Sequence, residues 1–419
     1  MHPGSDLTPA PQAMVRRLGL RDAVVVGMSA MIGAGIFSAF APAAAAAGSG
    51  LLIGLAIAAV VAYCNATSSA RLAARYPTSG GTYVYARHRL GELWAGQAGW
   101  AFIVGKTASC AAMALTVGSY VAPGHARPVA VLAVVALTAL GWAGVQRSTQ
   151  LSTVIVVVSL AALAVVVLAS FRGGTADPTN LQPFPGSDAV GILQSAGLLF
   201  FAFAGYARVA TLGEEVRDPT RTIPRAISIA LLVVLVVYGV VGLSALLAIG
   251  AHGLAATPAP LQAVVEAGSW AAWSPAVQVG AATASLGALL ALLLGVSRTV
   301  VAVARDRPPI ARLARLHART RTPRTAEVTI GIVVVALVST LDLRGAIGFS
   351  SFGVLVYYAI ANASALTLSR DEGRPPRLIP VVGLVGCLVL ACTLPLGAVL
   401  AGLVVVLLAT LEWAVGRRR

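Results

Sequence analysis

The stretch GMSAMIGAGIFSAFAPAAAAAG, residues 27–48, decides the fold prediction. It is apolar throughout, yet Gly33 and Gly35 lie near its middle and Pro42 follows them. A glycine in a helix interior costs up to about 1 kcal/mol relative to alanine, so this pair needs a reason. One reason is close packing between helices through small residues. The other is a break in the helix that frees backbone groups for a ligand, which a bilayer tolerates only beside a cavity or within protein.

A second interruption lies in LLFFAFAGYARVATLGEEVRDPTRTIPRAI, residues 198–227. Gly205 is in its interior, and a charged residue follows shortly after. Interrupted helices at corresponding places in two halves of a chain point to the substrate site of a secondary transporter. We expect the halves to be residues 22–170 and 190–368, each with five spans. Because five is odd, the second half must be inverted relative to the first.

The composition is typical of a membrane protein. Of the 419 residues, 58% are apolar and only 11% are charged, and the mean hydropathy is +0.86. Soluble globular chains carry roughly 25% charged residues, so the composition excludes a soluble enzyme, a disordered chain and a fibrous protein. The net charge of +15 would suggest nucleic acid for a soluble protein. Here we expect the lipid bilayer as partner and no nucleic acid.

The sequence predicts an all-α integral membrane protein with about twelve transmembrane helices, because about 20 apolar residues cross the hydrocarbon core as a helix. Alternating segments of a β-barrel are missing, as the run 154–168 illustrates. The expected spans are 22–47, 50–70, 96–121, 127–145, 150–170, 190–213, 226–250, 274–304, 326–341, 345–368, 378–395 and 396–415. Residues 1–21 and 416–419 are expected as tails, and 378–415 as two helices after the repeats.

The basic residues predict the orientation. Only Arg127, Arg172 and Arg344 fall in segments expected on the outer side, whereas nearly all others fall on the side of the two termini. An excess of arginine and lysine marks the cytoplasmic side of a membrane protein. We therefore expect a multi-pass protein of the plasma membrane with both termini in the cytoplasm.

Three motifs resemble the amino acid–polyamine–organocation permeases. They are IGAGIF at 32–37, YPTSGGTYVYAR at 76–87, and the motif at 198–227. Within this superfamily they look like bacterial amino acid permeases and cationic amino acid transporters, over about residues 22–370. The resemblance implies the inverted five-plus-five repeat of the leucine-transporter fold with two extra helices at the end. It also implies secondary transport of an amino acid by alternating access.

The resemblance also implies a substrate site at the two interruptions. In the family, backbone N–H groups of the unwound first span bind the substrate carboxylate, and a half-helix N-terminus suits an anion. An aromatic residue of the sixth span covers the substrate, and carbonyls freed there receive its amino group. The matching residues are Ile32, Gly33, Ala34, Gly35 and Ile36 in the first span and Phe201, Ala202, Phe203, Ala204 and Gly205 in the sixth. Without the resemblance, Phe201 is equally well explained as a core or lipid contact.

One position departs from the family pattern. Members that carry cationic substrates have an acidic residue two positions after the glycine of the sixth-span motif. Here Ala207 takes that place and Arg208 follows it. A cationic substrate would meet no carboxylate, so we expect a neutral or acidic amino acid. Arg208 is interpreted either as an inner-gate partner of Glu214 or Glu215, or as an attraction for an anionic substrate.

Lys106 is the only lysine of the chain and lies in GWAFIVGKTASC of the third span. Ionisable residues inside a membrane usually face a cavity. An ungapped match of this span to arginine–agmatine exchangers puts Lys106 and Cys110 on the substrate side. A lysine kept from water releases its proton more easily, so we expect Lys106 to titrate in proton-coupled or exchange transport. The alternatives are a structural lysine bonded to helix carbonyls and a permanent charge that anchors the substrate carboxylate.

Other functions find less support. Residues 286–295 of the eighth span hold no serine or threonine, so we expect no sodium site. P-loop, GxSxG and HExxH patterns are absent, and we expect no cofactor, no metal and no catalytic site. A channel or a structural membrane subunit is the alternative from another class, and paired interruptions favour a carrier over both. An exchanger, or a carrier of another small organic amine or acid, remains the alternative within transport.

Overall fold

The fold is almost entirely helical. A computed structural model describes residues 18–76, 80–143, 149–206, 209, 216–305, 308–314, 317 and 322–416. A single bridge between Leu18 and Val216 is the only β-pairing among these residues. The α-helices are α1 (Leu20–Met31), α2 (Ala34–Ser38), α3 (Phe40–Ala47), α4 (Leu51–Arg75), α5 (Thr82–Arg89), α6 (Glu92–Val121), α7 (Ala126–Trp142), α8 (Thr149–Arg172), α9 (Ala189–Phe203), α11 (Pro219–Ala255), α12 (Pro260–Glu266), α13 (Ser274–Arg305), α14 (Arg324–Thr340), α15 (Leu343–Leu366), α16 (Leu378–Thr393) and α17 (Leu396–Gly416).

Within the described residues, 10 helical segments are long and apolar enough to cross a membrane. The prediction of an all-α membrane protein is confirmed in this form. Helix α14 has 17 residues and α16 has 16, so both are shorter than those segments. The count of twelve spans and the inverted repeat therefore stay predictions.

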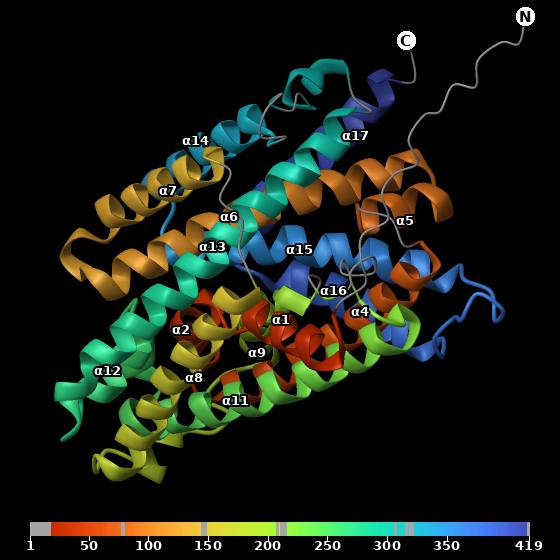
Figure 1. The fold of residues 1–419 in the computed structure, drawn as a ribbon. Helices are drawn as coiled ribbons and strands as arrows, with labels where there is room; N and C mark the ends of the chain where they lie inside the picture. Colours follow the sequence, from red (N-terminus) through yellow and green to blue (C-terminus); the bar gives the residue numbers. More distant parts are fainter. Residues whose placement is uncertain are drawn as a thin grey trace, which may run out of the picture.

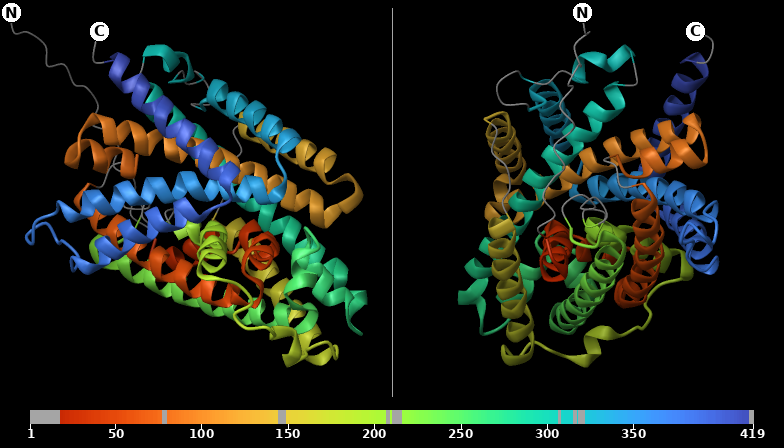
Figure 2. Two further views of the ribbon diagram at one scale, coloured as in Figure 1. Left: turned by 180° about the vertical axis from the view of Figure 1, so that it is seen from behind. Right: turned by 45° about the vertical axis from the view of Figure 1, so that its right-hand side comes forward.

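The helices divide into two packed groups, which Figure 1 and Figure 2 show from several sides. In one group, α13 and α15 both pack against α6, and α7, α14 and α17 also contact α6. Helices α1, α3, α4, α9 and α11 form the other group through mutual contacts. The short helix α2 touches α6, α9 and α13, so the first interruption lies between the groups.

Small residues allow the tightest contact of the first group. Gly105 of α6 and Gly353 of α15 meet so closely that a Cβ on Gly105 would lie 3.1 Å from the Gly353 Cα. The serines one turn away on each helix, Ser109 and Ser350, join their hydroxyls by a hydrogen bond. This packing through glycine and paired hydroxyls is typical of helices inside a membrane. It holds the middle of α6 rigidly in place.

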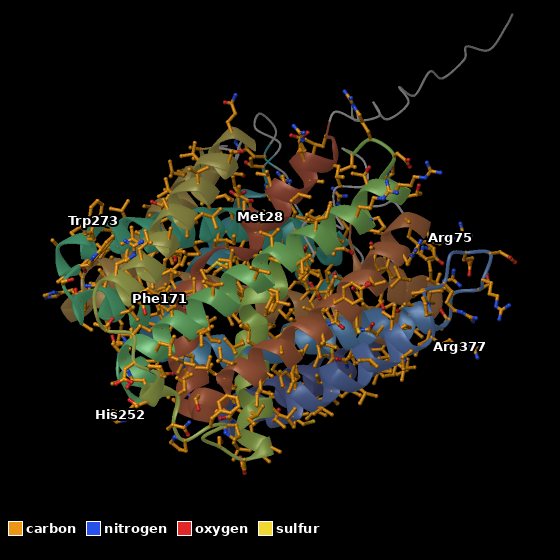
Figure 3. All side chains as sticks on the ribbon, turned by 90° about the horizontal axis from the view of Figure 1, so that it is seen from below. Met28, Arg75, Phe171, His252, Trp273 and Arg377 are labelled. Atoms are coloured by element: carbon orange, nitrogen blue, oxygen red, sulfur yellow. The ribbon has the colours of Figure 1, made fainter. Side chains whose placement is uncertain are left out.

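The outer surface is apolar. Large side chains of α7 and α17 are exposed, such as Leu132 at 68% and Leu407 at 59%. An apolar surface of this extent is costly in water, so these helices face lipid. Figure 3 shows the side chains over the whole molecule, with charged ones gathered toward the loops.

The two ends of the molecule differ. Helix α5 lies at one end and α12 at the other (Figure 1), and we call them the α5 end and the α12 end. At the α12 end, the loop after α8 contacts the neighbouring segments: Asp177 N–H donates to the Leu247 carbonyl over 2.9 Å, and Ser269 N–H donates to the Gly173 carbonyl over 3.3 Å. At the α5 end, Arg217 N–H donates to the Leu18 carbonyl over 2.9 Å, which joins the entry to α1 to the segment before α11.

Candidate functional site

The first span is broken where the glycines predicted it. Helix α1 ends at Met31, and Ile32 has φ −75° and ψ 72°, the geometry of an inverse γ-turn. The Gly33 N–H accordingly donates to the Met31 carbonyl over 2.8 Å. Gly33 itself is extended, with φ −127° and ψ −148°, before α2 begins at Ala34. Ala39 keeps a right-handed helical conformation, so α2 runs on into α3.

The sixth span changes its helical form at the predicted place. Helix α9 ends at Phe203, and the tighter 3₁₀ turn η4 (Ala204–Tyr206) follows. A 3₁₀ segment inside a membrane-spanning helix often marks a functional hinge. The first span is therefore broken between α1 and α2, and α9 gives way to η4 beside the glycine that the sequence singles out, just before the undescribed residues 207–208.

Glycines bring the two interrupted segments into direct contact. A Cβ on Gly35 would lie 2.5 Å from the Cα of Ala202, and a Cβ on Gly205 would lie 2.0 Å from the carbonyl oxygen of Ala30. Real Cβ atoms do not approach backbone so closely, so alanine at either position would push the segments apart. Both sequence interpretations thus describe part of the structure: the helix is broken at Ile32–Gly33, and Gly35 is a close-packing residue.

A tyrosine of α11 joins the two breaks. The Tyr238 hydroxyl lies 2.7 Å from the Met31 carbonyl oxygen and 3.1 Å from that of Ala202. Both carbonyls belong to last turns of helices, α1 and α9, where carbonyls lose their intrahelical partners. The Tyr238 ring also packs on Phe203, with ring centroids 5.2 Å apart. The hydroxyl has one proton to donate, so its hydrogen bond goes to one of these carbonyls at a time, and the phenol lies between the ends of the two helices.

Lys106 reaches the sixth-span break from α6. Its ammonium nitrogen donates to the Ala204 carbonyl over 3.3 Å, and its side chain is only 7% exposed. No carboxylate pairs with it in the part of the chain that the structure describes. Cys110, one turn further along α6, is fully buried. Lys106 thus bonds one backbone carbonyl, as expected for a structural lysine. That carbonyl, Ala204, lies in the turn that follows α9.

The remaining predicted site residues are buried at the same place in the fold. Ile32, Ala34 and Ile36 are at most 1% exposed, and Phe201 is 7% exposed. Helix α13 faces the first break with alanines: a Cβ on Gly33 would lie 3.1 Å from the Ala288 Cβ and 3.9 Å from the Ala284 carbonyl oxygen. Neither side chain offers an oxygen to a cation.

Some predicted residues lie outside the described parts. Ala207, Arg208, Glu214 and Glu215 fall between Tyr206 and Val216 and are not described, apart from the neighbouring Val209. The inner-gate interpretation of Arg208 with Glu214 or Glu215 therefore stays a prediction. Among the described residues, no group of three histidine, cysteine, aspartate or glutamate side chains could hold a metal.

Sequence reasoning missed Tyr238 and a second buried polar cluster. Asn362 of α15 donates from its amide nitrogen to the Asn65 side-chain oxygen of α4 over 2.6 Å, and the Cys387 thiol donates to the same oxygen over 3.3 Å. The rings of Tyr358 and Tyr206 contact each other nearby in a tilted arrangement, with centroids 5.1 Å apart. A lone polar residue in an apolar span was the available signal, because a buried polar group needs a partner.

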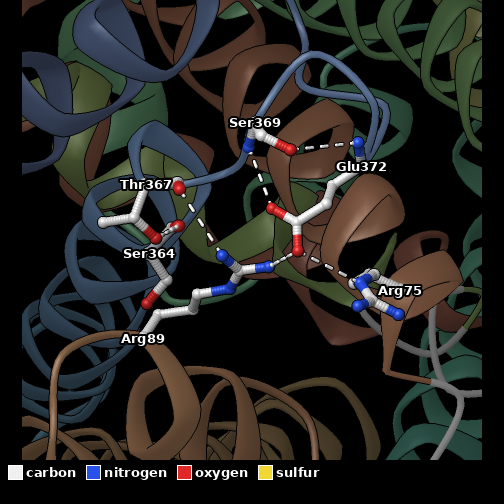
Figure 4. Close-up of polar contacts among 6 residues, drawn as sticks. All are labelled: Arg75, Arg89, Ser364, Thr367, Ser369 and Glu372. Atoms are coloured by element: carbon white, nitrogen blue, oxygen red, sulfur yellow. Dashed lines mark hydrogen bonds and ion pairs between the residues drawn. The ribbon is translucent and has the colours of Figure 1, made fainter.

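At the α5 end, one carboxylate joins three segments (Figure 4). Glu372, in the loop between α15 and α16, forms ion pairs with Arg89 of α5 and with Arg75 of α4, the latter over 3.2 Å. The Ser369 N–H donates to its second oxygen over 2.9 Å. The hydrogen bond from Arg89, followed by that from Ser369 and by Arg75, lowers the pKa of Glu372 from 4.5 to about 2. We call Arg75, Arg89 and Glu372 the α5-end latch.

Comparisons with known proteins agree with this architecture. The family model described as amino acid permease matches residues 18–410. An uncharacterized transporter of Mycobacterium tuberculosis is 62% identical over 392 residues, which cover 94% of this chain and 89% of that protein. The branched-chain amino acid permease BcaP of Bacillus subtilis is 26% identical, covering 92% of this chain and 90% of the permease. Cationic amino acid transporter 4 of Homo sapiens is 28% identical, covering 86% of this chain and 61% of the transporter.

Proposed function

This chain belongs to the amino acid permease family, and we propose that it carries neutral amino acids across the plasma membrane by alternating access. The observation that carries the proposal is the meeting of two interrupted helices at Gly35–Ala202 and Gly205–Ala30, with Lys106 beside them. Carriers place their substrate where two discontinuous helices leave backbone groups unpaired.

The first break supplies donors for a carboxylate. The first N–H groups of a helix have no carbonyl one turn before them, and they carry partial positive charge. Helix α2 begins at Ala34, so Ala34, Gly35 and Ile36 present such groups. The substrate carboxylate binds here, while the amino group binds carbonyls of Ala202–Gly205, and Phe201 covers the substrate.

The side chains around the breaks favour a neutral substrate. Residues 32–36 and 201–205, together with Cys110, contain no carboxylate, and Lys106 adds a cation beside the Ala204 carbonyl. A substrate with a second positive charge would be repelled by Lys106 and would lack a counter-charge. Among the relatives of this chain, BcaP is named for branched-chain amino acids and the human transporter for cationic amino acids. The family thus includes members named for neutral and members named for cationic substrates. An acidic amino acid is the second candidate, favoured by the same ammonium.

Transport is coupled to protons or runs as exchange, independent of sodium. A sodium site needs oxygen ligands, and the α13 residues nearest Gly33 are Ala284 and Ala288. Lys106 is the titrating group: its proton is shared with the Ala204 carbonyl when the site is empty. When protonated, Lys106 supplies a positive charge that holds the substrate carboxylate, and loss of the proton leaves the substrate weakly held.

Uptake into proteoliposomes tests the substrate class. We expect saturable uptake of labelled neutral amino acids and accelerated counterflow in vesicles loaded with the unlabelled compound. A channel would show no counterflow, because it does not exchange one molecule for another. Saturable uptake of arginine or lysine at micromolar concentration would contradict the neutral class. Counterflow with organic amines that lack a carboxylate, or organic acids that lack an amino group, would favour the alternative of a carrier for another small organic amine or acid.

The orientation is proposed from the charge distribution. Arg75, Arg89 and the loop of Glu372 lie together at the α5 end, and this end carries the segments that the sequence predicts to be cytoplasmic. Both termini then lie in the cytoplasm. A cysteine introduced at Asp371 would be labelled by a membrane-impermeant maleimide only in inside-out vesicles, whereas one at Thr179 would be labelled in intact cells.

A further inference from the structure

Three arginines of the loop between α15 and α16 surround a hollow at the α5 end. Arg370, Arg374 and Arg377, with Pro375 and Pro376, line an open cavity of about 670 Å³. No acidic side chain lines it. Figure 3 labels Arg377 at the edge of the molecule, beside the lowest part of this loop. The hollow is far along the chain from both interruptions and plays no part in the proposed substrate site.

The positive charge of the hollow is not neutralised by its surroundings. None of these three guanidinium groups makes an ion pair with any residue that the structure describes. The loop has two acidic residues, and Glu372 is already engaged by Arg75 and Arg89 in the α5-end latch. Asp371 is exposed and forms no ion pair with the loop arginines. The latch therefore fixes the loop and leaves its own arginines available.

A membrane-facing stripe begins beside the hollow. Helix α16 begins at Leu378, directly after Arg377. The N–H groups of Ile379 and Val381 donate to the Pro376 and Arg377 carbonyls, so the start of the helix is closed by its own backbone. Leu378 is 72% exposed, Val381 42%, Val385 54% and Leu388 51%. Residues three and four apart share one face of a helix, so these side chains form a continuous apolar stripe. The stripe leads from the arginines into the apolar part of the helix.

We propose that this hollow binds the phosphate group of an anionic phospholipid, whose acyl chains lie along the α16 stripe. Guanidinium groups bind phosphate oxygens through paired hydrogen bonds. A free phosphate would use the arginines alone, whereas the stripe beside them fits a ligand with hydrocarbon chains. The inference depends on insertion in a membrane and not on which substrate is carried.

Native mass spectrometry of the purified full chain tests the site, with phosphatidylglycerol and phosphatidylcholine as probes. The test variant is Arg370→Gln/Arg374→Gln/Arg377→Gln. The matched control is Arg71→Gln/Arg217→Gln/Arg221→Gln, which removes the same charge from exposed residues of the same end. We expect the test variant to retain phosphatidylglycerol about tenfold less than the wild type, with phosphatidylcholine unchanged and the control close to wild type. Equal losses in both variants would overturn the proposal.

Two further measurements separate a lipid from a soluble phosphate and cover the case in which the triple variant does not fold. Sodium phosphate and sodium chloride are compared as competitors at equal ionic strength, and displacement by phosphate alone would assign the hollow to a soluble phosphate instead of a lipid. If the triple variant does not fold, Arg377→Gln alone must still retain less phosphatidylglycerol than Arg221→Gln. Equal retention by these two single variants would contradict the proposal.

Discussion

Lys106 of α6 donates a hydrogen bond to the carbonyl oxygen of Ala204 over 3.3 Å, although 98 positions separate them in the chain. The contact links a titratable group to the interruption of another helix. The acceptor is of the kind that a substrate amino group needs. The contact therefore places the charge of Lys106 beside the proposed substrate site, which is the physical basis of the coupling proposed above.

Replacing Lys106 tests that coupling. Lys106→Met keeps a side chain of similar length but removes the titratable amine. We therefore expect the remaining uptake to lose the dependence on external pH that the wild type shows. Uptake is measured over a pH series, each point with and without sodium. Thr116→Ser, further along α6 where the hydroxyl bonds its own helix at the Ala112 carbonyl, is the control and should keep the wild-type pH profile.

Two results would refute this role for Lys106. The first is strict sodium dependence of the wild type. The second is an unchanged pH profile in a Lys106→Ala protein that still transports. A Lys106→Met protein that binds substrate about tenfold more weakly at every pH would instead identify Lys106 as a permanent anchor for the carboxylate.

Gly35 is expected to accept no side chain. Its Cβ would lie 2.5 Å from the Ala202 backbone, whereas a Cβ on Gly239 of α11 would meet no atom within 4 Å. We expect Gly35→Ala to lower uptake at least tenfold, Gly35→Leu to abolish it, and Gly239→Ala to stay within twofold of the wild type, because overpacking costs about 1–3 kcal/mol. Membrane insertion is checked by the amount of purified protein. Normal transport by Gly35→Leu would show that the two interruptions need not touch.

Tyr238→Phe tests the bridge between the breaks. The change removes the hydroxyl that lies near the Met31 and Ala202 carbonyls and keeps the ring contact with Phe203. A hydrogen bond contributes about 1 kcal/mol net, so we expect roughly a fivefold loss in apparent substrate affinity. Tyr63→Phe is the control, because Tyr63 is 46% exposed on α4. Equal affinities for Tyr238→Phe and the control would exclude a role for the bridge in binding.

Glu372→Gln is expected to loosen the α5-end latch in a pH-dependent way. The pKa of Glu372 is lowered to about 2, and a lowered carboxyl pKa gives stability that is complete above the ordinary pKa of 4.5 and is lost as pH falls toward about 2. The melting temperature of the wild type should therefore exceed that of Glu372→Gln at neutral pH. The difference should shrink as pH falls through this range. A constant difference would show that the ion pairs do not contribute through charge. Glu412→Gln, at the end of α17, is the comparison for a carboxylate that accepts a hydrogen bond from Trp100.

Asn362→Ala tests the second polar cluster. It leaves the Asn65 side chain without the amide donor that now lies 2.6 Å from its oxygen. Polar contacts between membrane helices contribute on average about 0.6 kcal/mol, so we expect a modest drop in melting temperature with uptake affinity preserved. Asn362→Asp keeps the shape and is compared beside it. A large loss of affinity in Asn362→Ala would mean that the cluster takes part in binding.

The sequence by itself determined the class of the molecule and the places of the two interruptions. Composition reveals a membrane protein because a bilayer excludes charge. Glycines mark Ile32–Gly33 and Ala204–Tyr206 because a helix interior disfavours them. The family motifs then identified the kind of transporter, which the match over residues 18–410 confirms.

Only the tertiary structure decided which residues meet. Gly35 lies against Ala202, Tyr238 spans the Met31 and Ala202 carbonyls, and Glu372 ties α4 to α5. Spacing along a helix predicts which residues share a face, but an apolar span is apolar on every side and does not say which face meets which neighbour. Such pairings depend on how all the helices pack together. For that reason the sequence could point to Lys106 but not to Ala204 as its partner.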